Sequence, residues 1–117
     1  MKYILVVEDD PINQLIIEDY LQDYEINLID DGQKCLDEVN KRKPDIILLD
    51  IAIPTIDGYQ VCQKLKSDKA YQDIPIIMVT AYAREKEKNK ALEIGANDYL
   101  TKPFKYESLM EIIKKYI

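Results

Sequence analysis

Short apolar runs alternate with longer stretches of helical period along the whole chain. Runs of strand length with few polar residues are typical of parallel strands that helices cover on both faces. The alternation predicts an α/β protein in which five βα units wind one doubly wound parallel sheet. The predicted strands are Tyr3–Val7, Ile26–Asp30, Ile46–Asp50, Ile74–Thr80 and Asp98–Leu100. Because 117 residues suffice for one core and not for two, residues 1–117 are interpreted as one domain.

Helices are predicted between these strands from apolar residues at helical spacing. Asp10-Pro11 opens the first helix, since aspartate caps a helix start and proline fits its first turn. The apolar face of this helix is expected to contain Ile12, Leu15, Ile16, Asp19 and Tyr20. The second helix is expected to face the core with Cys35, Leu36 and Val39, and the third with Val61, Cys62 and Leu65. A last helix over Phe104–Tyr116 is expected to place on one face Leu109, Ile112, Ile113 and Tyr116. Gly95 is expected to end the fourth helix in the left-handed conformation.

The balance of charges excludes several classes of partner. A formal net charge of -6 opposes unaided binding to nucleic acid or to an anionic membrane surface, so the expected partners are proteins. No run approaches the roughly 20 apolar residues of a membrane-spanning helix, and a cytoplasmic location is expected. The chain has no histidine, which excludes Ser-His-Asp and Cys-His catalytic groups and histidine-bound zinc. Cys35 and Cys62 lack the spacing of a metal site and are interpreted as buried thiols.

Polar side chains stand where the predicted strands end. In chain order they are Glu8 and Asp9, Asp50, Thr80 and Lys102. Open α/β sheets bind ligands at the edge formed by the carboxyl ends of their strands, so these side chains are expected to lie together. Three carboxylates at close range repel one another, and an oxygen-only cluster favours a hard cation such as Mg²⁺. With Glu8 and Asp9 holding the ion, Asp50 is the candidate nucleophile for an aspartyl phosphate.

Four blocks of sequence resemble the receiver domain of bacterial two-component response regulators. In chain order they are VVEDDPIN, LLDIAIPTIDG, VTAYA and DYLTKPF. The resemblance covers essentially the whole chain, and four blocks with appropriate spacing are far more specific than an acidic pair or a Lys-Pro alone. It implies a flavodoxin-like (βα)5 sheet with strand order 2-1-3-4-5 and helices on both faces.

The resemblance also implies a role for each site residue. The implied ligands of Mg²⁺ are Glu8, Asp9, Asp50 and the backbone carbonyl of Ala52. Asp50 resembles the phosphoacceptor, and Lys102 and Thr80 resemble the residues that contact the phosphoryl group. Thr80 and Tyr99 resemble a switch pair, although a tyrosine that only packs against its strand neighbours is the alternative for Tyr99. The Lys102-Pro103 bond resembles one that is cis in this family.

The implied function is that of a phosphoacceptor in a two-component phosphorelay and not that of an enzyme with a separate substrate. A histidine kinase or histidine phosphotransfer protein would phosphorylate Asp50, and the face of helix four, strand five and helix five would then bind a downstream effector. The chain would catalyse only its own phosphorylation and dephosphorylation. A monomer or weak dimer is expected, and Met1, with a last helix that finishes near Ile117, favours a free-standing regulator over an excised receiver.

Other functional classes fit the same residues less well. A phosphatase of the haloacid-dehalogenase type would need an acid at Ala52, a flavodoxin would need a phosphate-binding loop after the first strand, and a nucleoside triphosphatase would need GxxxxGK[ST]. The remaining alternative is a receiver-fold interaction module that phosphorylation does not regulate. The charged run Arg84–Lys90 is most simply a solvated helix face, with a protein-docking surface as the alternative.

Two features of the sequence bear on the rates of the implied reaction. Glu8 stands where the family more commonly has aspartate, and its longer side chain is expected to hold the metal through water. Ala52 and Tyr82 occupy positions that modulate hydrolysis of the aspartyl phosphate in the family, and neither offers an amide or carboxylate to orient a water. A comparatively long-lived phosphorylated state is therefore hypothesised.

Overall fold

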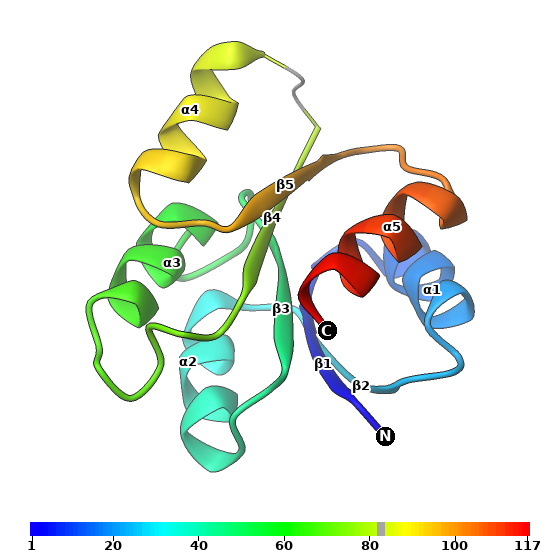
Figure 1. Ribbon diagram of the computed structural model, residues 1–117, viewed down its shortest axis with the longest axis horizontal. Helices are drawn as coiled ribbons and strands as arrows, with labels where there is room; N and C mark the ends of the chain where they lie inside the picture. Colours follow the sequence, from blue (N-terminus) through cyan, green and yellow to red (C-terminus); the bar gives the residue numbers. More distant parts are fainter. Residues whose placement is uncertain (82–83) are drawn as a thin grey trace.

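The computed structural model describes residues 1–81 and 84–117. One parallel sheet has the order β2-β1-β3-β4-β5, and its strands are β1 (Tyr3–Val7), β2 (Glu25–Ile29), β3 (Ile46–Asp50), β4 (Ile76–Thr80) and β5 (Asp98–Thr101). The helices are α1 (Pro11–Tyr20), α2 (Gly32–Lys41), α3 (Gly58–Lys66), α4 (Glu85–Glu93) and α5 (Tyr106–Tyr116). α1 and α5 cover one face of the sheet, and α2, α3 and α4 lie on the other side (Figure 1). The predicted flavodoxin-like fold and its strand order are confirmed.

The sheet separates two apolar layers, because successive strand residues point to opposite faces. Leu5 and Val7 of β1 pack with α2 and α3, whereas Ile4 and Val6 pack with α1 and α5. Every residue of β1, β3 and β4 is buried, and β2, at the edge, is only half-buried. The thiols of Cys35 and Cys62 are free and lie in the first layer, where burial raises their pKa values to about 12 and about 11.

Several element boundaries differ from the sequence-based prediction by one or two residues. β2 lies one residue earlier than predicted, and β4 begins at Ile76 because Pro75 has no N–H to donate to a neighbouring strand. α5 begins at Tyr106, two residues later than expected. Gly95 ends α4 with φ +106°, as predicted. No helix in the described ranges is long and apolar enough to cross a membrane.

α1 contacts the sheet through a different face from the one predicted. Its buried residue is Ile17, and Leu21 just beyond the helix is also buried, whereas Ile12 and Leu15 are each 68% exposed and Ile16 is 41% exposed. The prediction holds for Tyr20, which is half-buried and packs against the core, and it is wrong for Ile12, Leu15 and Ile16, because counting apolar residues favours the face that these three share. The inner face instead carries polar Gln14, whose side-chain amide donates a hydrogen bond to the Glu8 carbonyl oxygen at 2.6 Å.

The loop between β3 and α3 is fastened to the start of α2. Gly32 N–H donates to the Pro54 carbonyl oxygen at 3.1 Å, and a Cβ at Gly32 would lie only 2.0 Å from the carbonyl oxygen of Ile56. Thr55 adopts φ 66°, a conformation rare for a β-branched residue, and its hydroxyl donates to Oδ1 of the helix-capping Asp31 at 2.9 Å. Contacts with the start of α2 therefore hold this loop in position, and these contacts lie away from the end of β3 at Asp50.

Candidate functional site

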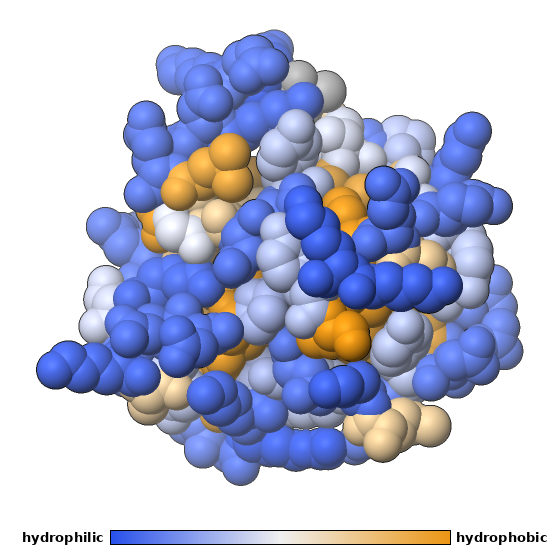
Figure 2. All heavy atoms as spheres, in the orientation of Figure 1, coloured by the Kyte–Doolittle hydropathy of each residue, from blue (hydrophilic) through white to orange (hydrophobic). Residues whose placement is uncertain are grey.

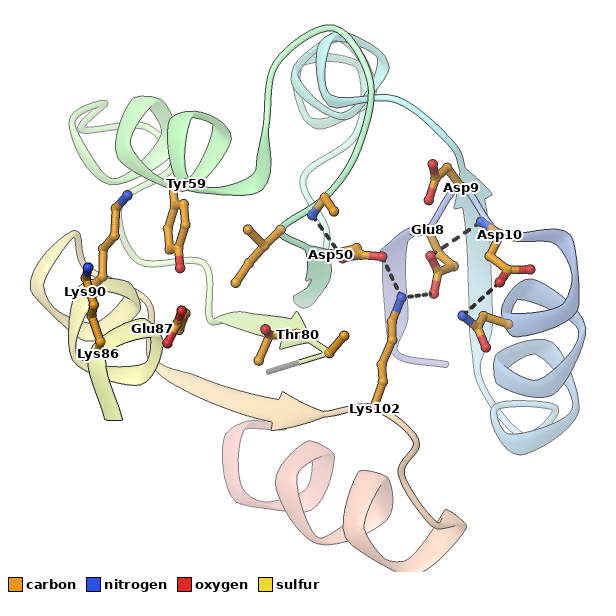
Figure 3. Close-up of a pocket in the computed structure, with 14 residues that line it drawn as sticks. Glu8, Asp9, Asp10, Asp50, Tyr59, Thr80, Lys86, Glu87, Lys90 and Lys102 are labelled. Atoms are coloured by element: carbon orange, nitrogen blue, oxygen red, sulfur yellow. Dashed lines mark hydrogen bonds and ion pairs between the residues drawn. The ribbon is translucent and has the colours of Figure 1, made fainter. Parts of the chain in front are cut away.

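A pocket of about 600 Å³ opens at the carboxyl edge of the sheet (Figure 3). Residues from the β1–α1 loop, the ends of β3 and β4, the segment after β5 and the helices α3 and α4 line it. The predicted site residues that line it are Glu8, Asp9, Asp50, Ala52, Thr80 and Lys102. Tyr99 lies on β5 outside this lining, and Tyr82 lies outside the described residues.

Three carboxylates meet on one side of the pocket. Glu8 and Asp50 are 2% and 6% exposed, Asp9 is exposed to solvent, and one oxygen from each lies within 4.8 Å of the others. The amide N–H of Ala52 donates to Oδ1 of Asp50 at 3.1 Å. This oxygen-only set fits a hard divalent cation, which prefers carboxylate and carbonyl oxygens.

The ammonium group of Lys102 bridges the two buried carboxylates (Figure 3). Its Nζ lies 2.6 Å from Oε1 of Glu8 and 2.6 Å from Oδ2 of Asp50. Burial, and then hydrogen bonding with Asp50, raises the pKa of Glu8 although Lys102 opposes the shift. Burial works against the charge on Lys102, but hydrogen bonds to Asp50 and Glu8 raise its pKa above the ordinary value. The ammonium therefore stays charged and offsets the repulsion between the two carboxylates.

The backbone around the site holds these side chains in place. Gly58 N–H donates to the Ile51 carbonyl oxygen at 2.8 Å, and a Cβ at Gly58 would lie 2.5 Å from the carbonyl oxygen of Asp50. The N–H of Lys102 donates to the Thr80 carbonyl oxygen at 2.7 Å, which joins the segment after β5 to the end of β4. The Lys102-Pro103 bond is cis, as predicted. Asp10 caps α1 as predicted, because its carboxylate accepts from the Ile12 N–H at 2.9 Å.

The opposite side of the pocket was not predicted. Tyr59 from α3 and Lys86, Glu87 and Lys90 from α4 line it (Figure 3). Nζ of Lys90 lies 4.3 Å from the centre of the Tyr59 ring, and burial, followed by the nearby charge of Glu87, raises the pKa of the Tyr59 hydroxyl. Spacing alone places residues 86 and 90 on one side of a helix, but a run with so few apolar residues does not show which side faces the pocket.

The family of the chain follows from its sequence and agrees with this geometry. A family model for the response regulator receiver domain matches residues 4–114. The chain belongs to the response regulator receiver domain family. As a receiver domain it is a signalling domain of two-component systems, and the relatives described next are regulators or parts of sensor kinases.

Three relatives illustrate the range of proteins that this receiver domain resembles. The DNA-binding dual master transcriptional regulator RpaA of Synechocystis sp. is 37% identical over 97% of the chain, which spans only 48% of RpaA. The polar-differentiation response regulator DivK of Brucella anthropi is 32% identical, covering 99% of the chain and 96% of DivK. The receiver domain of sensor histidine kinase PA1611 from Pseudomonas aeruginosa superimposes with a TM-score of 0.90 at 35% identity, covering 98% and 96% of the two chains. The PA1611 structure has a magnesium ion coordinated in its active site cleft.

Proposed function

We propose that this receiver domain accepts a phosphoryl group on Asp50 in a two-component phosphorelay. The observation that supports the proposal most directly is the Asp50 carboxylate itself, which ends a buried strand, faces an open pocket and lies 2.6 Å from the Lys102 ammonium. A carboxylate held in this way is positioned to react, and phosphoryl transfer depends mainly on positioning and on neutralising charge.

The proposed reaction is an in-line displacement on a phosphohistidine of the donor protein. A carboxylate oxygen of Asp50 attacks phosphorus, the P–O bond forms as the P–N bond breaks, and the bonding electrons return to the imidazole nitrogen. Lys102 moves its ammonium from the carboxylates toward the negative oxygens of the phosphoryl group, and Thr80, 4% exposed beside Asp50 in the pocket, contacts the transferred group. The site needs no histidine of its own for this step.

Mg²⁺ is the proposed cofactor, held by carboxylates of Glu8, Asp9 and Asp50 and by the carbonyl of Ala52. The cluster of carboxylate oxygens supports this assignment, as does the magnesium in the related PA1611 receiver. When bound, the ion supplies positive charge to the phosphoryl oxygens. Lys102 contacts Oε1 of Glu8, so the ion would be a second positive charge beside this carboxylate.

The proposal is tested by the intact mass of the protein after incubation with a small-molecule phosphodonor, with and without Mg²⁺. The wild type is expected to gain one phosphoryl group only with Mg²⁺, and Asp50→Asn is expected to gain none while remaining folded by circular dichroism. No gain under any condition would instead support the alternative, an interaction module with the receiver fold that phosphorylation does not regulate.

A histidine kinase or histidine phosphotransfer protein is the proposed donor, and α1 is its proposed docking surface. Ile16 lines a hollow of about 430 Å³ between α1 and the segment that follows β5, and Ile12 and Leu15 expose apolar side chains on the same helix. Asn13 and Lys102 line both this hollow and the pocket of Asp50, so a protein seated there reaches the carboxylate. Exposed apolar side chains beside a reactive site mark a protein interface.

Leu15→Ser is expected to slow phosphorylation by the donor protein about tenfold, the loss typical of one apolar anchor of an interface. Phosphorylation by a small-molecule donor is expected to stay unchanged, because Leu15 is outside the pocket and 68% exposed. Parallel time courses with the two donors measure the difference, and Glu18→Ser, at an exposed site on the same helix, is the control. Equal slowing with both donors would argue against docking on α1.

Phosphorylation is proposed to alter the face of α4, β5 and α5, where a downstream effector protein binds in trans. Thr80 at the end of β4 and Tyr99 on β5 occupy neighbouring strands of the sheet, which supports a joint movement. No direct binding to nucleic acid is proposed for this acidic chain, and a monomer or weak dimer is proposed as its state.

A long-lived phosphorylated state remains a hypothesis from Ala52 and Tyr82. Ala52 lines the pocket next to Asp50 and offers no side-chain amide to orient water. Ala52→Asn is expected to hasten loss of the phosphoryl group about tenfold, less than the 10²–10⁴ of a full general base. The decay of the phosphorylated mass after removal of the donor measures this rate. An unchanged decay would refute the hypothesis for this position, and Ala52→Ser controls for added bulk.

A further inference from the structure

Apolar burial contributes little to the attachment of α4. Among the residues of α4, all of which the structure describes, Ala91 alone is buried, and Leu92 is 47% exposed. α3 and α5 each bury several large side chains. The atoms over α4 at the top of Figure 2 are mostly hydrophilic. Because stabilisation by burial scales with apolar area, other contacts must set the position of α4.

Two lysines of α4 supply such contacts by resting on tyrosine rings. Nζ of Lys88 lies 4.7 Å from the ring centre of Tyr99 on β5, and Nζ of Lys90 lies 4.3 Å from that of Tyr59 on α3. Both rings are half-buried and pack against the same core layer, so packing holds them in place and the lysines of α4 contact rings that do not move freely. An ammonium within about 6 Å of a ring centre is attracted by the ring face. Residues two apart point to different sides of a helix, and these two contacts therefore hold α4 from two sides.

Glu87 opposes this position of the helix. Its Oε2 is buried without a hydrogen-bond partner among the described residues, in the pocket that Tyr59 also lines. A buried carboxylate oxygen without a partner is unfavourable, and a shift of α4 that brings it to water or to a donor removes that cost. The lysines attract α4 only weakly, and the unsatisfied carboxylate of Glu87 disfavours its present position. We therefore expect alternative positions of α4 to be close to this one in free energy.

We propose that Lys88 is a positioning residue for Tyr99, and that its charge over the ring favours the unphosphorylated arrangement of α4 and β5. The proposal rests on the proposed function, in which Tyr99 moves when Asp50 is phosphorylated. A ring held under an ammonium must leave that contact to change rotamer. Removal of the charge then shifts the resting equilibrium toward the phosphorylated arrangement, with no change in the pocket that performs the chemistry, since Lys88 is not among its lining residues.

The test compares Lys88→Met with Lys114→Met on the full chain. Methionine is nearly as long as lysine and has a similar helix propensity, but it has neither the charge nor the N–H donors of the ammonium. Lys114 is the control because it is an exposed helical lysine that lies outside the pocket of Asp50 and has no ring contact among the described residues. Lys88→Arg restores a cation over the ring. Two measurements are made without phosphodonor: the Tyr99 signal in protein with ¹³C-labelled tyrosine rings, assigned by Tyr99→Phe, and amide hydrogen exchange of α4.

Lys88→Met is expected to hasten α4 exchange and to raise the population of the alternative Tyr99 arrangement about two- to fivefold, as one exposed cation–π contact predicts. Its Tyr99 signal should move toward that of phosphorylated wild type, and Lys114→Met and Lys88→Arg should match unphosphorylated wild type. Equal behaviour of the two methionine variants would overturn the proposal. If wild type cannot be phosphorylated, faster exchange in Lys88→Met alone would support the contact while the proposed function fails.

Discussion

Lys102→Met is expected to slow phosphorylation of Asp50 by a small-molecule donor about 10²–10³-fold, the cost of removing one charged or hydrogen-bonding group that faces a transition state. The ammonium lies 2.6 Å from the Asp50 carboxylate and lines its pocket. Rates of mass gain at saturating Mg²⁺ measure the effect. Lys105→Met removes an exposed lysine three residues away and is expected to react at the wild-type rate. A wild-type rate in Lys102→Met would exclude Lys102 from the reaction.

The same substitution is expected to lower the free energy of unfolding by about 3 kcal/mol at pH 7 without metal, because it leaves two buried carboxylates without their shared cation. The pKa of Glu8, already raised from its ordinary 4.5, rises further in this variant. The folded variant then binds more protons than the unfolded chain, so its stability falls as the pH rises above 4.5.

Urea unfolding of the variant and the wild type at pH 7 and near pH 4.5 checks the sign. The deficit of the variant should shrink at the lower pH, and Mg²⁺ should restore part of it at pH 7, since the ion replaces the missing positive charge. A deficit that is independent of both pH and Mg²⁺ would mean that lost packing of the lysine stem, and not charge, explains the loss.

Gly32→Ala is expected to destabilise the fold by more than about 3 kcal/mol, above the usual range for an overpacked site. The added methyl group would meet a backbone oxygen, that of Ile56, at 2.0 Å, and backbone cannot move aside as a flexible side chain can. Separation of the β3–α3 loop from α2 would also move the loop that carries Ala52. Urea unfolding measures the loss of stability, and the rate of phosphorylation measures the effect on the site. As a control, Gln33→Ala at the next, exposed position should change the free energy of unfolding by less than about 0.5 kcal/mol. A stable Gly32→Ala protein would show that this junction is flexible.

The sheet and the acidic side of the pocket could be predicted because their residues obey simple spatial rules. Strands such as Ile46–Asp50 are apolar up to their last residue, and parallel strands bring the polar residues at their ends to one edge. α1 broke the rule that apolar residues face inward, since Gln14 turns inward to hold the Glu8 carbonyl and Leu15 turns outward. The sequence of α4 has too few apolar residues to fix its rotation, and thus the contacts of Lys88 and Lys90 became visible only in the structure.

Different residues of α1 attach the helix to the core and form its exposed apolar surface. Ile17 and the adjacent Leu21 attach the helix to the sheet, and Ile12, Leu15 and Ile16 remain outside the core. Substitutions at the exposed positions are therefore expected to leave the folded state intact, so the donor specificity proposed for α1 could change in evolution through a series of stable intermediates. If α1 docks the donor as proposed, the same separation would let an engineer exchange its exposed residues between related receivers to change the donor without redesigning the core.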